Sequence, residues 1–146
     1  MKIIKFATIF ALTFLVTTTL VAQQAEKTLV KAFNLQGHDL IQIELDGPVE
    51  VRTWKQNILR VQMVIKLENG SENLLKSLVQ IGRYNLKSGI GEQGFHIFAP
   101  NMKREVKIGG KVINESLTYV IYAPEGVQVK LPNTASTQVV EVDSSL

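Results

Sequence analysis

Strict alternation of apolar and polar side chains constrains the fold of this chain more than any other feature. From Leu59 to Leu67 every second residue is apolar, and polar residues such as Arg60, Gln62 and Lys66 stand between them. Successive side chains of a β-strand point to opposite faces, so this period of two predicts a strand with one buried face. Turn-bounded stretches predict further short strands within residues 38–45, 48–54, 95–100, 104–110, 117–123 and 126–132.

One segment departs from the period of two. Its apolar residues recur at helical spacing, at Leu74, Leu75, Leu78 and Val79. Ser71 is a suitable N-cap, Glu72 lies in the first turn where the helix dipole favours a carboxylate, and Gly82 can end the helix. The pattern therefore predicts one short helix near residues 71–81, with its apolar stripe packed on the sheet.

Together these elements predict an all-β domain with one short helix. We expect mainly antiparallel pairing, as a sheet or sandwich, or else a short solenoid-like β domain. Two stretches, residues 41–53 and 119–131, both run from an apolar strand through a glycine-containing turn into a Val-x-Val strand. Two copies are too few for a repeat array. We therefore interpret the similarity as that of two hairpins whose strands both alternate apolar and polar residues.

The amino-terminal residues have the layout of a secretory signal peptide. Lys2 and Lys5 precede an uncharged apolar run from Phe6 to Val21, and Ala22 supplies a small residue for cleavage. We expect residues 1–22 to be a signal peptide and residues 23–146 a single β-rich domain with a polar tail from about 132. Export would place the domain in the periplasm or at the cell surface. The alternative is an uncleaved leader that tethers an accessory protein to the membrane.

Composition excludes several classes of function. The chain has no cysteine, which rules out disulfides, thiol catalysis and a lipid on an N-terminal cysteine. Lys and Arg number 16 against 13 Asp and Glu, but two of the basic residues belong to the predicted leader. The expected mature chain is thus close to neutral, and we predict no nucleic-acid partner and membrane contact only through a retained leader.

No catalytic, metal or cofactor site is predicted. Residues 89–94 match G-x-G-x-x-G, but a strand rather than a helix follows, so this stretch is expected to be a hairpin loop. His38 and His96 stand alone, without the spacing of a metal site, and G-x-S-x-G does not occur. We therefore expect a non-enzymatic protein. A small periplasmic enzyme that uses His38 or His96 is the alternative.

Three aromatic residues form the candidate interaction surface: Trp54, Tyr119 and Tyr122. Trp54 ends its predicted strand beside a turn, where a ring is often half exposed. Tyr119 and Tyr122 are three residues apart, so they face opposite sides of a regular strand. Tryptophan and tyrosine are enriched at interface hot spots, although a single tryptophan more often belongs to the core.

The strand motifs Val49–Trp54, Leu59–Leu67 and Tyr119–Val129 resemble the head portion of DUF4097-type putative adhesins. These are exported bacterial β-proteins, common in Bacteroidetes, and the resemblance covers roughly residues 39–131. It implies a β-rich fold and an adhesin-like or interaction module of the envelope, with an unknown protein or glycan partner. The predicted helix is a departure from the family pattern, and the resemblance implies no catalytic residues.

Overall fold

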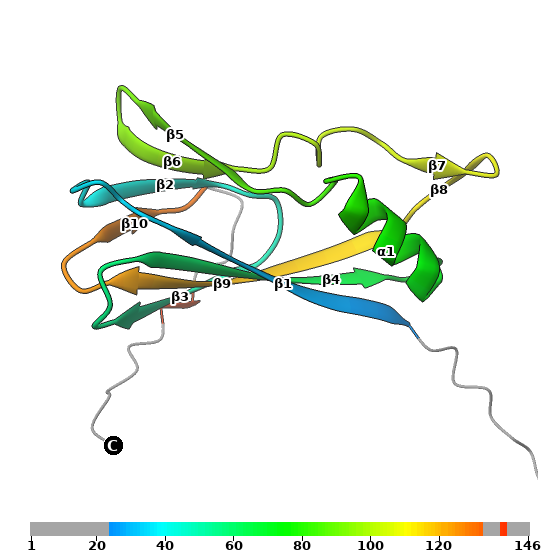
Figure 1. Cartoon of the computed structure of the whole chain (residues 1–146), viewed down its shortest axis with the longest axis horizontal. Coiled ribbons are helices and arrows are strands. Elements are labelled where there is room, and N and C mark those ends of the chain that lie inside the picture. Colours follow the sequence, from blue (N-terminus) through cyan, green and yellow to red (C-terminus); the bar gives the residue numbers. More distant parts are fainter. Residues whose placement is uncertain (1–23, 133–137, 140–146) are drawn as a thin grey trace, which may run out of the picture.

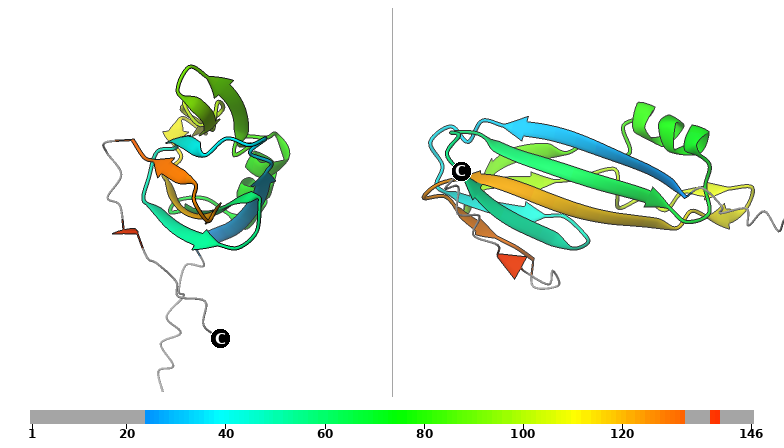
Figure 2. Two further views of the ribbon diagram at one scale, coloured as in Figure 1. Left: turned by 90° about the vertical axis from the view of Figure 1, so that its left-hand side faces the viewer. Right: turned by 90° about the horizontal axis from the view of Figure 1, so that it is seen from below.

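The computed structural model describes residues 24–132 and 138–139, so the predicted signal peptide at residues 1–22 lies outside the described residues. Two β-sheets face each other, and a short helix lies over one end of the larger sheet (Figure 1). Seen end-on, the strands of both sheets surround a common interior (Figure 2, left). The predicted class, mostly β with one short helix, is confirmed for the described part of the chain.

The larger sheet has five strands in the order β1-β4-β9-β3-β11. Strands β1, β4 and β9 pair antiparallel with one another, whereas β9 pairs parallel with β3, and β3 parallel with β11. The right-hand view of Figure 2 looks onto this sheet, with β1 in blue and β9 in orange. The bounds are β1 Ala25–Phe33, β3 Val49–Trp54, β4 Leu59–Leu67, β9 Glu115–Pro124 and β11 Gln138–Val139.

The second sheet has the order β10-β2-β6-β5. Strands β10, β2 and β6 are parallel, and β5 closes the sheet as an antiparallel edge. A two-stranded hairpin of β7 and β8 projects at the far end of the molecule (Figure 1). The bounds are β2 Leu40–Glu44, β5 Lys87–Gly91, β6 Gly94–Phe98, β7 Lys107–Ile108, β8 Lys111–Val112 and β10 Gln128–Lys130.

Both sheets are mixed, with the longest pairings antiparallel and several parallel pairs beside them. The parallel pairs arise because the chain crosses between the sheets at short turns. It passes from β2 in the second sheet to β3 in the larger one, and returns from β9 to β10. These two crossings are the two similar stretches of the sequence, residues 41–53 and 119–131. They run between the sheets in opposite senses.

Strand β4 supplies the centre of the core. Its five inward residues are each at most 1% exposed, and they are Leu59, Val61, Met63, Ile65 and Leu67. Ile121 on β9 and Ile41, Ile43 and Ile97 of the second sheet belong to the same apolar cluster. Burial of large aliphatic side chains contributes about 1.5–3 kcal/mol each, so this layer dominates the stability of the sandwich.

The helix α1, Glu72–Gln80, confirms its prediction at both ends. The Ser71 hydroxyl accepts a hydrogen bond from the backbone N–H of Leu74 at 3.2 Å. Gly82, with φ of +77°, ends the helix, and the backbone of Arg83 donates to the carbonyl of Leu78 at 3.1 Å. That pairing is the Schellman motif, in which glycine adopts the left-handed conformation. Leu75 and Leu78 are buried in the core.

Two elements differ from the prediction. Strand β1 was not predicted, because at the edge of the sheet its core-facing side carries Lys27 and Lys31 and the alternation is lost. Residues 104–110 contain only the two-residue strand β7, since the backbone of residues 99–106 is occupied by turns and side-chain contacts. The stretch 89–94 lies in the β5–β6 hairpin, but the loop is shorter than expected: residues 89–91 belong to β5, Gly94 begins β6, and only residues 92–93 form the turn. In the part of the chain described, no helix has the length and apolar character to cross a bilayer.

The burial pattern of β4 leads to a matched prediction. Replacing Ile65, which is 0% exposed, by alanine should lower the free energy of unfolding by about 2–5 kcal/mol, because a buried cavity forms. Replacing its neighbour Val64, which is only partly buried on the other face, should cost about 1 kcal/mol or less. Guanidinium unfolding of both variants measures the difference, and equal losses would contradict the assigned inner face.

Candidate functional site

A row of charged and aromatic side chains crosses the outer face of the larger sheet. Tyr122 on β9 stands directly opposite Arg60 on β4 and opposite Arg52 on β3. The flanking residues Val61 and Ile121 are buried, so the period of two directs this row away from the core. Directly opposed side chains of neighbouring strands are within contact distance, which brings the three together.

Trp54 joins the row because it lies two residues beyond Arg52 on β3 and therefore shares its face. The ring centroids of Trp54 and Tyr122 are 5.3 Å apart, with an angle of 41° between the planes. The indole Nε1–H donates a hydrogen bond of 2.9 Å to the carbonyl of Ile58, in the turn that follows β3. This bond holds the half-buried indole in one orientation.

Both guanidinium groups pack against the aromatic rings. The Arg60 guanidinium carbon lies 4.6 Å from the ring centroid of Tyr122 and 5.3 Å from that of Trp54. The Arg52 guanidinium carbon is 5.7 Å from the Tyr122 centroid, on the other side of the row. In such cation–π contacts the ring attracts the positive charge of the guanidinium, which helps to hold the arrangement together. We call Arg52, Trp54, Arg60 and Tyr122 the aromatic–arginine face.

The two arginines of this face differ in their partners. Arg52 Nε donates to Glu50 Oε1 at 2.7 Å, and this hydrogen bond raises the pKa of Arg52 above its ordinary value. Arg60 Nε, in contrast, is buried and has no hydrogen-bond partner among the residues that the structure describes. No carboxylate of the described residues forms an ion pair with Arg60. The face therefore combines two cations with one anion and has an excess of positive charge.

The structure brings together two of the three predicted site residues. Trp54 and Tyr122 are neighbours on the aromatic–arginine face. Tyr119 is only 2% exposed, on the core side of the same strand, and burial raises its pKa to about 12. Tyr119 therefore does not share the outer face with Trp54 and Tyr122. Sequence reasoning missed Arg52 and Arg60, because only the pairing of strands far apart in the sequence shows that they flank Tyr122.

The histidines stand apart from this face. His96 lies on the outer face of the second sheet, 5.2 Å from the Phe98 ring between centroids. A Cβ on Gly89 would stand 2.7 Å from the imidazole, so this glycine of the G-x-G motif makes room for the His96 ring. His38 lies 6.1 Å from Phe95 between ring centroids. Within residues 24–132 and 138–139 no three His, Cys, Asp or Glu side chains are grouped as metal ligands.

A buried ion pair is the second cluster of titratable groups. Arg83 and Glu115 have side chains that are each 8% exposed, and two bonds of 2.5 and 2.8 Å join the guanidinium to the carboxylate. The Tyr84 hydroxyl donates to the same carboxylate at 2.5 Å. Arg83 Nη1 donates to the backbone carbonyls of Asn101 and Arg104. The arrangement ties the end of α1 to the loop of residues 99–106 and to the start of β9.

The ionisation of this cluster follows from its contacts. Burial opposes the charge on Glu115, but the hydrogen bonds from Arg83 and Tyr84 outweigh burial, so the pKa of Glu115 lies below its ordinary value. Burial and the bond to Glu115 raise the pKa of Tyr84. The carboxylate is thus charged, the phenol neutral and the guanidinium fully engaged. A saturated cluster of this kind fits a structural clamp better than a binding site.

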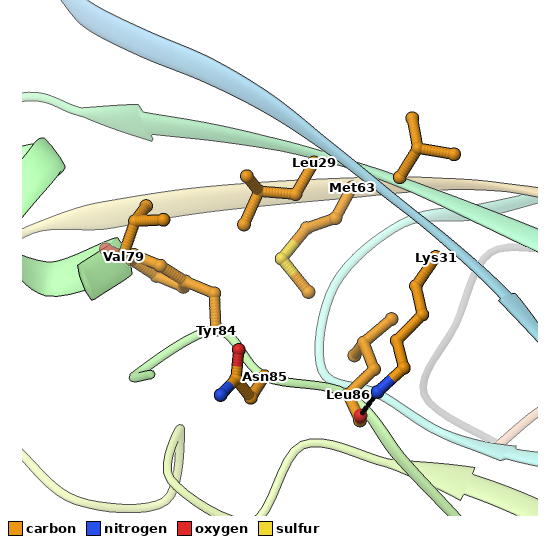
Figure 3. Close-up of a pocket in the computed structure, with 8 residues that line it drawn as sticks. Leu29, Lys31, Met63, Val79, Tyr84, Asn85 and Leu86 are labelled. Atoms are coloured by element: carbon orange, nitrogen blue, oxygen red, sulfur yellow. Dashed lines mark hydrogen bonds between the residues drawn. The ribbon is translucent and has the colours of Figure 1, made fainter. Parts of the chain in front are cut away.

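One pocket of about 220 Å³ opens between the edge strand β1 and the segment that follows α1 (Figure 3). Leu29, Met63, Val79 and Tyr84 form its apolar wall, and Lys31 Nζ donates to the carbonyl of Leu86 at 2.6 Å. Sites for small molecules usually measure about 300–1,000 Å³. The pocket is smaller than that range, and the aromatic–arginine face is the stronger candidate.

Comparisons with known proteins give weak matches. No protein-family model and no curated protein matches the sequence, so the DUF4097 resemblance stays a prediction from its motifs. A putative adhesin from Bacteroides fragilis is similar in structure with a TM-score of 0.42 at 7% identity, over 78% of this chain and 44% of that one. A putative cell adhesion protein from Clostridium sporogenes gives 0.40 at 14% identity, over 73% and 45%. This chain spans less than half the length of either structure.

The buried cluster of Arg83, Tyr84 and Glu115, which we call the clamp, leads to a prediction about how stability depends on pH. Because the pKa of Glu115 is lower in the folded state, its ionised form stabilises the fold above the ordinary carboxyl value of 4.5, and this contribution is lost as the pH falls. Glu115→Gln should lower the free energy of unfolding at neutral pH by about 3–5 kcal/mol, since Arg83 is left buried without its partner. The variant should also lose less stability than the wild type between about pH 6 and about pH 3.

Glu105→Gln is the matched control, because Glu105 pairs with Lys107 in an ion pair whose side chains are more than half exposed. It should change the free energy of unfolding by about 1 kcal/mol or less. Urea unfolding across the pH range measures both effects. Parallel pH profiles of the wild type and Glu115→Gln would show that the carboxylate does not stabilise the fold.

Proposed function

We propose that this chain is an exported, non-enzymatic interaction module of the bacterial envelope, adhesin-like in role, which binds a protein or glycan partner through the aromatic–arginine face. The observation that carries the proposal is the meeting of Trp54 and Tyr122 between two arginines on one sheet face. Trp, Tyr and Arg are the three residue types most enriched at binding hot spots.

The face is suited to binding because it is rigid. Arg60 and Tyr122 lie on β4 and β9 where each strand is paired on both sides, while β3 is covered by β11 only at Glu50 and Val51. Behind the row, the inner faces of β4 and β9 are packed in the core. Side chains held by packing and hydrogen bonds lose little conformational entropy when a partner binds.

A pair of threonine variants tests the proposal. Tyr122→Thr removes the central ring but keeps a side chain that favours strands, whereas Phe98→Thr makes the same type of change on the outer face of the second sheet. The purified full chain is applied to immobilised glycans and extracellular proteins, and each ligand that binds is titrated. Loss of a hot-spot ring should weaken binding by about 2 kcal/mol or more, which is about thirtyfold.

The control variant Phe98→Thr should bind like the wild type. Circular dichroism and thermal unfolding confirm that both variants are folded. Unchanged binding by a folded Tyr122→Thr variant would contradict the assigned surface. Failure of the wild type to bind any glycan or protein of the panel would contradict the proposed function itself.

Export is tested separately, with a tag at the carboxyl terminus of the full chain in intact bacteria. Cleavage after Ala22 should give a mature chain that begins at Gln23, and mass spectrometry of the purified product reads this directly. Added protease removes the tag if the domain is at the cell surface and leaves it if the domain is periplasmic. An intact N-terminus in the membrane fraction would indicate a retained leader, and an intact N-terminus in the cytosol would contradict export.

A further inference from the structure

We infer that the aromatic–arginine face binds an acidic polysaccharide, with the two guanidinium groups on sugar carboxylates and the two rings against sugar faces. The inference rests on the proposed function and names the chemistry of its partner. Its starting point is Arg60, a cation on the outer face of β4 that forms no ion pair with the described residues and lies over the rings of Trp54 and Tyr122.

The buried Nε of Arg60 cannot be reached from outside, so a bound anion would have to meet the Nη atoms of this guanidinium. No carboxylate of the described residues forms an ion pair with them. The Arg60 guanidinium carbon lies over the rings of both Tyr122 and Trp54, and these two contacts restrict its position on the face. A planar fork of N–H donors matches a carboxylate, which can accept two parallel hydrogen bonds.

The row already shows how it holds a carboxylate. Glu50 Oε1 accepts from Arg52 Nε at 2.7 Å, and the Tyr122 hydroxyl lies 3.4 Å from Arg52 Nη1. Neighbouring strands are about 4.8 Å apart, so the backbones that carry Arg52 and Arg60 are about 10 Å apart across the sheet. Two cations at that spacing, with one internal anion, suit a polymer that presents repeated negative charges.

The rings select sugar among the anionic polymers. Sugar rings have apolar C–H faces that stack on aromatic rings, while their hydroxyls and carboxylates point outward. Trp54 and Tyr122 meet at 41°, and each is partly exposed on the sheet surface. A sugar face against either ring places a carboxylate on the same residue close to a guanidinium.

Other anionic partners fit the face less well. Peptides usually bind at a sheet edge or in a groove, whereas Arg60 and Tyr122 lie where β4 and β9 are paired with a strand on both sides. Anionic lipid surfaces are recognised by clusters of about 4–8 basic residues, whereas in the described part of the chain the cations that meet at Tyr122 are Arg52 and Arg60. The face therefore favours a short, rigid contact with a carboxylated glycan.

Binding at this face can be followed by indole fluorescence, because Trp54 is the only tryptophan in the chain. The full chain is titrated with polygalacturonate, a linear polyuronate, and with the neutral polymer dextran, while indole fluorescence is recorded at low ionic strength. We expect a saturable change with polygalacturonate and none with dextran. Added salt should weaken the binding, because charges at an exposed surface are screened.

Three variants separate the guanidinium from general charge. Arg60→Gln should weaken binding of polygalacturonate by about tenfold or more. Lys66→Gln removes one positive charge from the same face of the same strand, where Lys66 pairs with Glu26 at 3.1 Å, and should change affinity by less than about twofold. Arg60→Lys keeps the charge without the planar fork and should fall between Arg60→Gln and the wild type.

Glu50→Gln tests the same idea by a gain of affinity, which misfolding cannot imitate. It removes the internal carboxylate that occupies Arg52, so binding of polygalacturonate should tighten by about threefold or more. Equal affinity of Glu50→Gln and the wild type would overturn the role of the Arg52 guanidinium. Equal losses in Arg60→Gln and Lys66→Gln would overturn the specific role of Arg60.

Two further ligands identify other classes of partner. Tighter binding of poly-L-glutamate than of polygalacturonate would overturn the glycan assignment in favour of an acidic peptide. Tighter binding of phosphatidylglycerol vesicles would overturn it in favour of a membrane. Absence of polygalacturonate binding, with Tyr122-dependent binding to another ligand of the panel, would reject this inference and leave the proposed function standing. If a folded Tyr122→Thr variant bound every ligand as tightly as the wild type, the aromatic–arginine face would be rejected as the binding surface. If the wild type bound no ligand, the proposed function would be rejected.

Discussion

Burial of the inner face of β4 is the constraint on which the rest of the structure depends. The five residues of this face are almost completely inaccessible, and β4 is paired along its whole length with β1 and over most of it with β9. A slip of one residue in the register of β4 would expose all five at once, which fixes the register. The same constraint sets the outer face: with Leu59 and Val61 inside, Arg60 must point outward, next to Tyr122. The candidate binding face is thus a consequence of the core, built on the reverse side of the same strands.

Much of the fold can be read from local sequence because its signals are local. The period of two predicted β4 and its buried face, and helical spacing with Ser71 and Gly82 predicted α1 and both of its ends. The opposite orientations of Tyr119 and Tyr122 follow from their separation by three residues, and one is buried while the other is on the surface. These features depend on neighbours within one element, which the order of residues specifies directly.

The features that sequence reasoning missed all depend on contacts between distant segments. Arg52 and Tyr122 are 70 residues apart in the chain and meet only because β3 and β9 pair in parallel. No pattern in the local sequence of either strand predicts this pairing. Strand β1 lacks an alternating pattern because an edge strand tolerates lysines on its inner side. The clamp joins Arg83 to Glu115 across 32 residues, and neither residue is distinguished locally from a solvated charge. Partner choice across a sheet is a property of the whole chain.

Two arginines of this protein show how differently one side chain can be used. Arg83 is buried, and its donors meet one carboxylate and two backbone carbonyls, so its charge is compensated inside the molecule. Arg60 is held by the faces of two rings, which stabilise a cation but accept no strong hydrogen bond from Nε. No carboxylate of the described residues compensates the charge of Arg60, whereas Glu50 pairs with Arg52 on the same face. The charge of Arg60 is therefore available to an anionic group of a partner, and the rings of Trp54 and Tyr122 beside it offer apolar surfaces to the part of the partner that carries this group.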